Sequence, residues 1–223
     1  MNSLFSTFDP SGIFHLNLNW LSCFSVLMLT CGFWAVSNIY SKFWSFLMNF
    51  IYVELSLIFP NKGRGEVHLY LSIFLFIFYM NFMGLFPYIF TPSSHLCTTF
   101  FLSIPLWLGS QMLFWFNDTN NMFAHLVPEG TPFGLMPLLV LIETVSNIIR
   151  PLTLSIRLMA NMTAGHLLLS LLGGGSSIES ISSILMVMFM LVFLIGLELG
   201  VSIIQSYVFT LLTALYVNEG ESH

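Results

Sequence analysis

One apolar stretch, residues 143–172, carries the side chains that could do chemistry. They are Glu143, Arg150, Arg157, Asn161 and His166. A charge at the centre of a bilayer costs roughly 2.5–3.5 kcal/mol on insertion scales, so each ionisable residue here needs a partner or a task. Glu143, Arg150 and Arg157 follow one another at intervals of seven residues and so share one face of a helix. Asn161 lies one turn further on nearly the same side.

A second apolar stretch, residues 180–217, has a polar set of its own. Glu198 and Gln205 are seven residues apart, with Ser202 between them, and Gly196 and Gly200 form a pair of small residues that lets another helix approach. We expect the two stretches to place their acids, imidazole and amides around the helix face that carries Arg150 and Arg157. Such groups suit proton transfer, because the acids and imidazole titrate and the amides hold water.

Arg157 has a different task from the titrating groups, because a guanidinium stays protonated in proteins. It suits a fixed positive barrier that pairs transiently with a carboxylate and blocks direct leakage of protons. The alternative is a permanent structural ion pair between Arg157 and Glu143 or Glu198.

Composition identifies the class of protein. Hydrophobic residues make up 57% and charged residues 7% of the 223 residues, whereas soluble domains carry about 25% charged residues. The apolar runs are continuous rather than alternating, which predicts an all-α integral membrane protein and excludes a barrel. With a net charge of −5 and no basic patch, nucleic acid is not expected as a partner. The three cysteines, Cys23, Cys31 and Cys97, lack the spacing of a disulfide framework or a metal site.

The pattern along the chain predicts a single membrane domain, residues 1–223. Its expected parts are a span at 13–36, an amphipathic interfacial helix at 37–59, spans at 67–90 and 95–116, a polar loop at 117–132, and a hairpin of long helices at 133–172 and 180–217. Each long helix would measure about 60 Å, twice the hydrocarbon core, so it must be strongly tilted or broken. Mid-span Asn81 is expected to bond another helix. Lys42, Lys62 and Arg64 fall between the first two spans and place that section on the inner side, with the N-terminus outside.

Several motifs resemble subunit a of the F-type ATP synthase in its mitochondrial form. They are RLMANMTAGH at 157–166 with IET at 142–144, LVPEGTP at 126–132, LE at 197–198 and IQSYVF at 204–209. The motifs cover residues 123–217; the N-terminal half matches in the number and placement of helices. The resemblance implies a non-catalytic proton-channel subunit of the mitochondrial inner membrane, with its N-terminus on the intermembrane-space side and its C-terminus on the matrix side. Its partners would be a rotating ring of c subunits, other membrane-sector and peripheral-stalk subunits, and lipid. No nucleotide, cofactor or metal is implied.

The resemblance also implies residue roles. Arg157 matches the arginine that faces the ring carboxylate, and Asn161 matches the polar residue one turn further along. His166 and Glu198 match two positions of the inlet half-channel. Gln205 matches a glutamine near the arginine, and Glu143 matches an acid on the outlet side. In bacterial relatives the acid and imidazole of the inlet pair are exchanged, as two positions in contact would allow.

Two other functions would also place ionisable residues in a helical membrane protein or leave them without a role. A subunit of a respiratory proton pump would show more spans, lysines within the membrane and internal repeats, none of which this sequence has. A structural assembly protein without transport would not need Arg157 in lipid.

Overall fold

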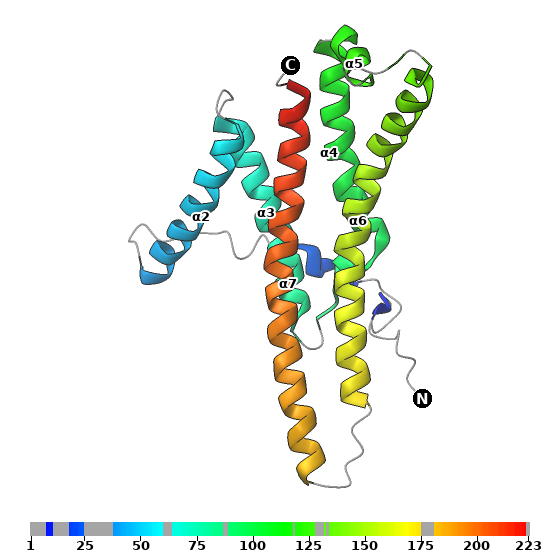
Figure 1. Cartoon of the computed structure of the whole chain (residues 1–223). Coiled ribbons are helices and arrows are strands. Elements are labelled where there is room, and N and C mark those ends of the chain that lie inside the picture. The colour runs from blue at the N-terminus through cyan, green and yellow to red at the C-terminus, as the bar shows by residue number, and fades with distance from the viewer. Residues whose placement is uncertain are drawn as a thin grey trace.

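The computed structural model describes residues 8–10, 18–24, 38–59, 64–86, 89–117, 119–127, 132, 134–174 and 181–221. Within these residues the regular secondary structure is helical, which confirms the all-α prediction. In chain order the elements are the 3-10 helix η3 (Leu18–Phe24), α2 (Ile39–Ile58), α3 (Arg64–Gly84), the 3-10 helix η4 (Pro92–Ser94), α4 (Leu96–Asn117), α5 (Thr119–His125), α6 (Met136–Gly174) and α7 (Ile181–Glu221), as Figure 1 shows.

Four of these helices, α3, α4, α6 and α7, are long and apolar enough to cross a membrane. α2 is not among them, although it is 20 residues long. In Figure 1 it leans away from the other helices, and its position at the membrane interface stays a prediction. Of the predicted span at 13–36, only η3 and its 3-10 conformation are described; the rest lies outside the described residues.

Two boundaries differ from the sequence-based expectation. The span expected at 67–90 ends at Gly84, where a Cβ would approach Thr91 Cγ2 to 2.6 Å, so the helix end packs closely against the segment that follows. The expected polar loop at 117–132 contains α5 instead. The rings of Phe123 and Trp115 meet edge to face at 5.3 Å, and this contact gives α5 an apolar anchor on α4.

The two long helices are continuous and antiparallel (Figure 1). α6 has 39 residues and α7 has 41, so each is about 60 Å long at 1.5 Å per residue. Pro137 is the second residue of α6, where a missing N–H costs little, and Pro151 lies inside the helix without ending it. The alternative of broken helices is therefore wrong, and strong tilt of the two helices in the bilayer stays a prediction.

The core lies where α3, α4, α6 and α7 meet. Its buried residues are Ile77, Leu154, Leu158 and Phe209, with Leu102 and Leu106 of α4 packed against them. A second buried cluster joins α2 to α3 and α7. In lipid these contacts stabilise the fold by close packing rather than by removal of apolar surface from water.

Candidate functional site

Arg157 lies on the outer side of α6. The buried residues of this helix form one stripe: Pro151, Leu154, Ser155, Leu158 and Met162. On a different face, Arg157, Asn161, Ala164, Leu168 and Leu171 follow at helical spacing, and all five are exposed. Among the described residues no ion pair or hydrogen bond holds Arg157, so the structural pair with Glu143 or Glu198 is not what the structure shows.

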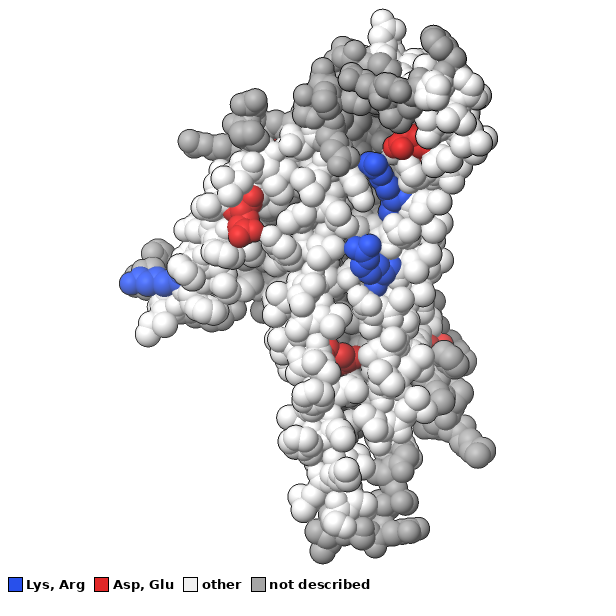
Figure 2. Space-filling view, viewed as in Figure 1, with Lys and Arg blue, Asp and Glu red and all other residues white. Residues whose placement is uncertain are grey.

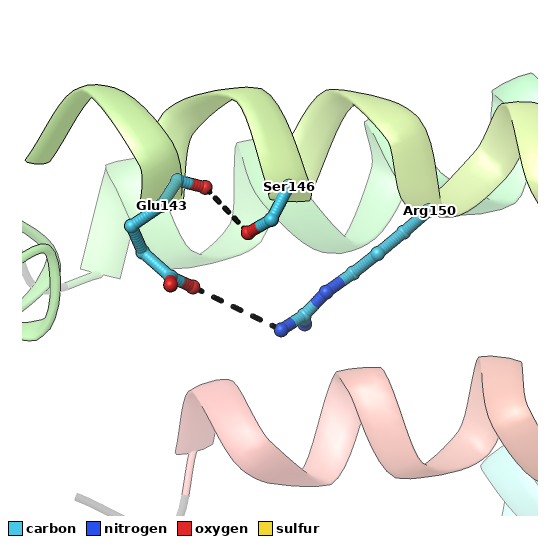
Figure 3. Close-up of polar contacts among 3 residues, drawn as sticks. All are labelled: Glu143, Ser146 and Arg150. Atoms are coloured by element: carbon cyan, nitrogen blue, oxygen red, sulfur yellow. Dashed lines mark hydrogen bonds and ion pairs between the residues drawn. The ribbon is translucent and has the colours of Figure 1, made fainter. Parts of the chain in front are cut away.

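Glu143 pairs with Arg150 instead. Nη2 of Arg150 lies 3.9 Å from Oε1 of Glu143, and the Ser146 hydroxyl donates to the Glu143 carbonyl at 2.8 Å (Figure 3). The Arg150 guanidinium also lies 4.8 Å from the ring centroid of Tyr216 on α7. The predicted shared face is thus confirmed for Glu143 and Arg150, while the contact with Tyr216 could not be read from spacing.

Asn161 and Gln205 connect the two long helices one turn from Arg157. Nδ2 of Asn161 donates to Oε1 of Gln205 at 2.9 Å. Gln205 is only 4% exposed, and its Nε2 is buried without a hydrogen-bond partner in the described part of the chain. A buried amide with a free donor attracts water or another acceptor, since an unsatisfied group of this kind is costly.

Glu198 packs against the backbone of α6 at Gly165. A Cβ on Gly165 would overlap the Glu198 carboxyl group, so any other side chain at this position would displace that carboxyl group. Both carboxyl oxygens of Glu198 are buried, and neither has a hydrogen-bond partner among the described residues. The glycines expected to allow close approach, Gly196 and Gly200, have open space where a Cβ would be. Within this chain, close helix contact therefore occurs at Gly165 rather than at the small-residue pair.

His166 follows Gly165 and points towards a different neighbour. Its ring meets that of Phe8 edge to face at 6.3 Å, and Nε2 would lie 3.9 Å from a Cβ on Gly84. This nitrogen is also buried without a partner in the described part of the structure. Glu198 thus lies against the residue before His166, and no hydrogen bond joins His166 and Glu198 in the residues described.

The site residues form a line along the hairpin rather than one cluster. Glu143 and His166 are 23 residues apart on one continuous helix, a separation of about 35 Å. The expectation of acids and imidazole gathered around one arginine face is therefore wrong, because helix length separates them. Arg157 lies between Glu143 on one side and the Gly165–Glu198 contact on the other. The sequence reasoning missed Gly165, although a glycine inside an apolar helix is a recognised sign of close packing.

A cavity of about 550 Å³ lies between η3, α3 and α4 and reaches Leu158, the residue after Arg157. Most of its lining is apolar. Asn81 borders it and is 0% exposed, yet neither its Nδ2 nor its Oδ1 has a hydrogen-bond partner among the described residues. The expected bond from Asn81 to another helix is thus not made within that part of the chain.

Charged side chains are few on the face shown in Figure 2, where the described surface is otherwise uncharged. No group of three or more potential metal ligands occurs in the part of the chain that the structure describes. These features define a multi-pass helical membrane protein that holds ionisable groups along its longest hairpin.

The profile of the ATP synthase A chain family matches residues 16–218. ATP synthase subunit a of Drosophila yakuba is 51% identical over 225 residues, which cover 98% of this chain and 99% of the relative. The proteins of the same name from Anopheles quadrimaculatus and Locusta migratoria are 47% and 45% identical, with the same coverage of both chains. The chain therefore belongs to the ATP synthase A chain family.

Proposed function

We propose that this chain is the non-catalytic, proton-conducting stator subunit in the membrane sector of a mitochondrial F-type ATP synthase. Its membership of the family and the name of its insect relatives support this role. The observation that carries it is the exposed Arg157, which lies on the outer face of the long hairpin and has no acidic partner among the described residues. A cation kept free in this position is available to a carboxylate on another subunit.

The rotating partner would be a ring of c subunits, each with one carboxyl group. In lipid that group is neutral, since desolvation disfavours its charged form. Beside Arg157 the charged form is favoured, so the carboxyl group releases its proton there. Reprotonation from the opposite side of the membrane lets the ring advance. The membrane potential contributes about 2.3 kcal/mol per charge for each 100 mV, so several protons must pass for each ATP made.

Two half-channels would supply and remove these protons. His166 and Glu198 form the inlet group, with Asn161 and Gln205 as amides between that group and Arg157. Glu143 belongs to the outlet. Gly165 is eight residues from Arg157 on α6 and Glu143 is fourteen residues away in the other direction, distances of about 12 and 21 Å along the axis. Separation on opposite sides of a fixed cation prevents a continuous proton path through the subunit.

The remaining surface suits lipid and neighbouring subunits of the complex. Exposed apolar side chains occupy nearly the whole first half of α7, including Leu185, Met188, Phe189, Val192 and Phe193. Gly196 and Gly200 leave this half of the helix smooth enough for a partner helix to come close. We assign the N-terminus to the intermembrane-space side and the C-terminus to the matrix. Nucleotides would bind to the soluble head of the complex and not to this chain.

The test is Arg157→Ala in the complete complex, reconstituted into vesicles. We expect ATP-driven proton pumping to be abolished while the chain still copurifies with a c-subunit ring. Arg150→Ala, on the same helix, is the matched control and should keep most of the pumping. Coupled pumping by the Arg157→Ala complex would overturn the proposal. Absence of a copurifying ring would favour the respiratory-pump or assembly-protein alternatives.

A further inference from the structure

Glu54 is a half-buried acid that the proposed proton path does not use. It lies in the second half of α2, next to Leu55, which is buried against α3 and α7. Its Oε2 accepts a hydrogen bond of 2.7 Å from the hydroxyl of Tyr207 on α7. A half-buried acid packed among apolar helices needs a hydrogen-bond partner, and here the partner comes from the helix that carries Gln205.

Gln205 and Tyr207 are two residues apart, so their side chains leave α7 about 200° from each other. Gln205 is bonded to Asn161 of α6, and Tyr207 is bonded to Glu54 of α2. These two hydrogen bonds therefore hold the middle of α7 from nearly opposite sides. A rotation of α7 about its own axis stretches both of them.

The hydroxyl groups nearby do not share this task. Those of Ser202, Ser206, Thr210 and Thr213 donate to backbone carbonyls of α7 itself. They satisfy their own helix and do not fix its orientation against a neighbour.

We propose that Glu54 is a positioning residue, which fixes the rotation of α7 through Tyr207 and so keeps Gln205 against Asn161 beside Arg157. This inference rests on the proposed proton-conducting function for its consequence, but the geometry it describes can be measured without proton flow. The side chain of Glu54 acts as a hydrogen-bond acceptor and takes no part in proton transport. The side-chain oxygen of a glutamine at position 54 can therefore replace it.

The first experiment measures orientation. In a cysteine-free background, Asn161→Cys and Gln205→Cys are combined in the complete complex, and the yield of the disulfide between them is measured under mild oxidation. The two cysteines remove the hydrogen bond between Asn161 and Gln205, so the Glu54–Tyr207 hydrogen bond alone fixes the rotation of α7. Adding Tyr207→Phe should therefore lower the disulfide yield several-fold. Tyr216→Phe, which keeps its ring beneath Arg150, is the matched control and should leave the yield unchanged. An unchanged yield with Tyr207→Phe would overturn the inference.

The second experiment measures coupled pumping in the native background. Tyr207→Phe and Glu54→Leu should each lower ATP-driven pumping about tenfold, the scale of one hydrogen bond to a charged group, and the double variant should be no worse than either. Glu54→Gln should keep more than half of the pumping.

If Glu54→Gln is as damaging as Glu54→Leu, Glu54 carries protons and the positioning role is wrong. Should Glu54→Leu fail to assemble, Tyr207→Phe decides alone, because it removes a single oxygen. Failure of the proposed function would appear separately, as normal pumping by Arg157→Ala.

Discussion

The carboxyl group of Glu198 lies directly against the backbone of Gly165, in the space that a methyl group on residue 165 would occupy. The two residues come from different helices, 33 positions apart in the sequence. Glycine here has a specific structural reason, which is the space taken by an acid on the neighbouring helix.

Gly165→Ala should displace the Glu198 carboxyl group and lower ATP-driven pumping at least tenfold, a barrier change of about 1.4 kcal/mol. The complex should still assemble, and hydrolysis by the soluble head should continue. Gly109→Ala, on α4, is the control, because open space surrounds that position. Normal pumping by the Gly165→Ala complex would show that the carboxyl position is unimportant.

The Asn161–Gln205 hydrogen bond should appear as a coupling energy. Hydrogen bonds between membrane helices average about 0.6 kcal/mol in double-mutant cycles, with a maximum near 1.7 kcal/mol. We expect a value in this range from the unfolding of Asn161→Ala, Gln205→Ala and the double variant. Gln205→Glu should preserve the bond, because the side chain keeps an oxygen that accepts from Nδ2. Strict additivity of the two alanine substitutions would contradict the contact.

Arg150 should matter for stability and little for transport. Its ion pair with Glu143 is long, at 3.9 Å, and the two side chains are 34% and 39% exposed. Exposed pairs contribute about 0–1 kcal/mol, and the contact with the Tyr216 ring adds about 0.5–1 kcal/mol. Arg150→Gln should therefore lower the unfolding free energy by about 1 kcal/mol and leave pumping within twofold of the original complex. A complete loss of pumping would assign Arg150 a direct role.

Asn81→Leu should leave stability unchanged or raise it. The Asn81 amide is fully buried without a partner among the described residues, so no hydrogen bond offsets the free-energy cost of removing it from water. The adjoining cavity gives room for the slightly larger side chain. Thermal unfolding of the purified complex measures the change, and Asn161→Leu, which breaks a hydrogen bond, is the destabilising comparison. A loss of more than about 1 kcal/mol for Asn81→Leu would mean that its amide has a partner after all.

Sequence reasoning located most helices because hydropathy and length determine them. The expected interfacial helix at 37–59 and the spans at 95–116, 133–172 and 180–217 match α2, α4, α6 and α7 within a few residues. The end of α3 was misplaced because the residues after Gly84 are as apolar as the span itself. α5 was missed because its polar residues resemble a loop and its anchor, Trp115, belongs to another helix.

Periodicity along one helix predicted which site residues share a face, and it could not predict contacts between helices. The pairing of Glu143 with Arg150 follows from an interval of seven residues. The bond between Asn161 and Gln205 spans 44 residues, and that between Glu54 and Tyr207 spans 153. Such pairs depend on how two helices are rotated and shifted against each other, and hydropathy contains no information on either.

The serine and threonine column of α7 bears on how the protein enters the bilayer during synthesis. Because the hydroxyls of Ser202, Ser206, Thr210 and Thr213 are satisfied within their own helix, they add little to the cost of placing α7 in lipid before its neighbours arrive. Glu198, Gln205 and Tyr207 have no such internal partner. These three side chains therefore reach their neighbours only when the bundle closes, when Glu198 and Gln205 meet α6 and Tyr207 meets α2.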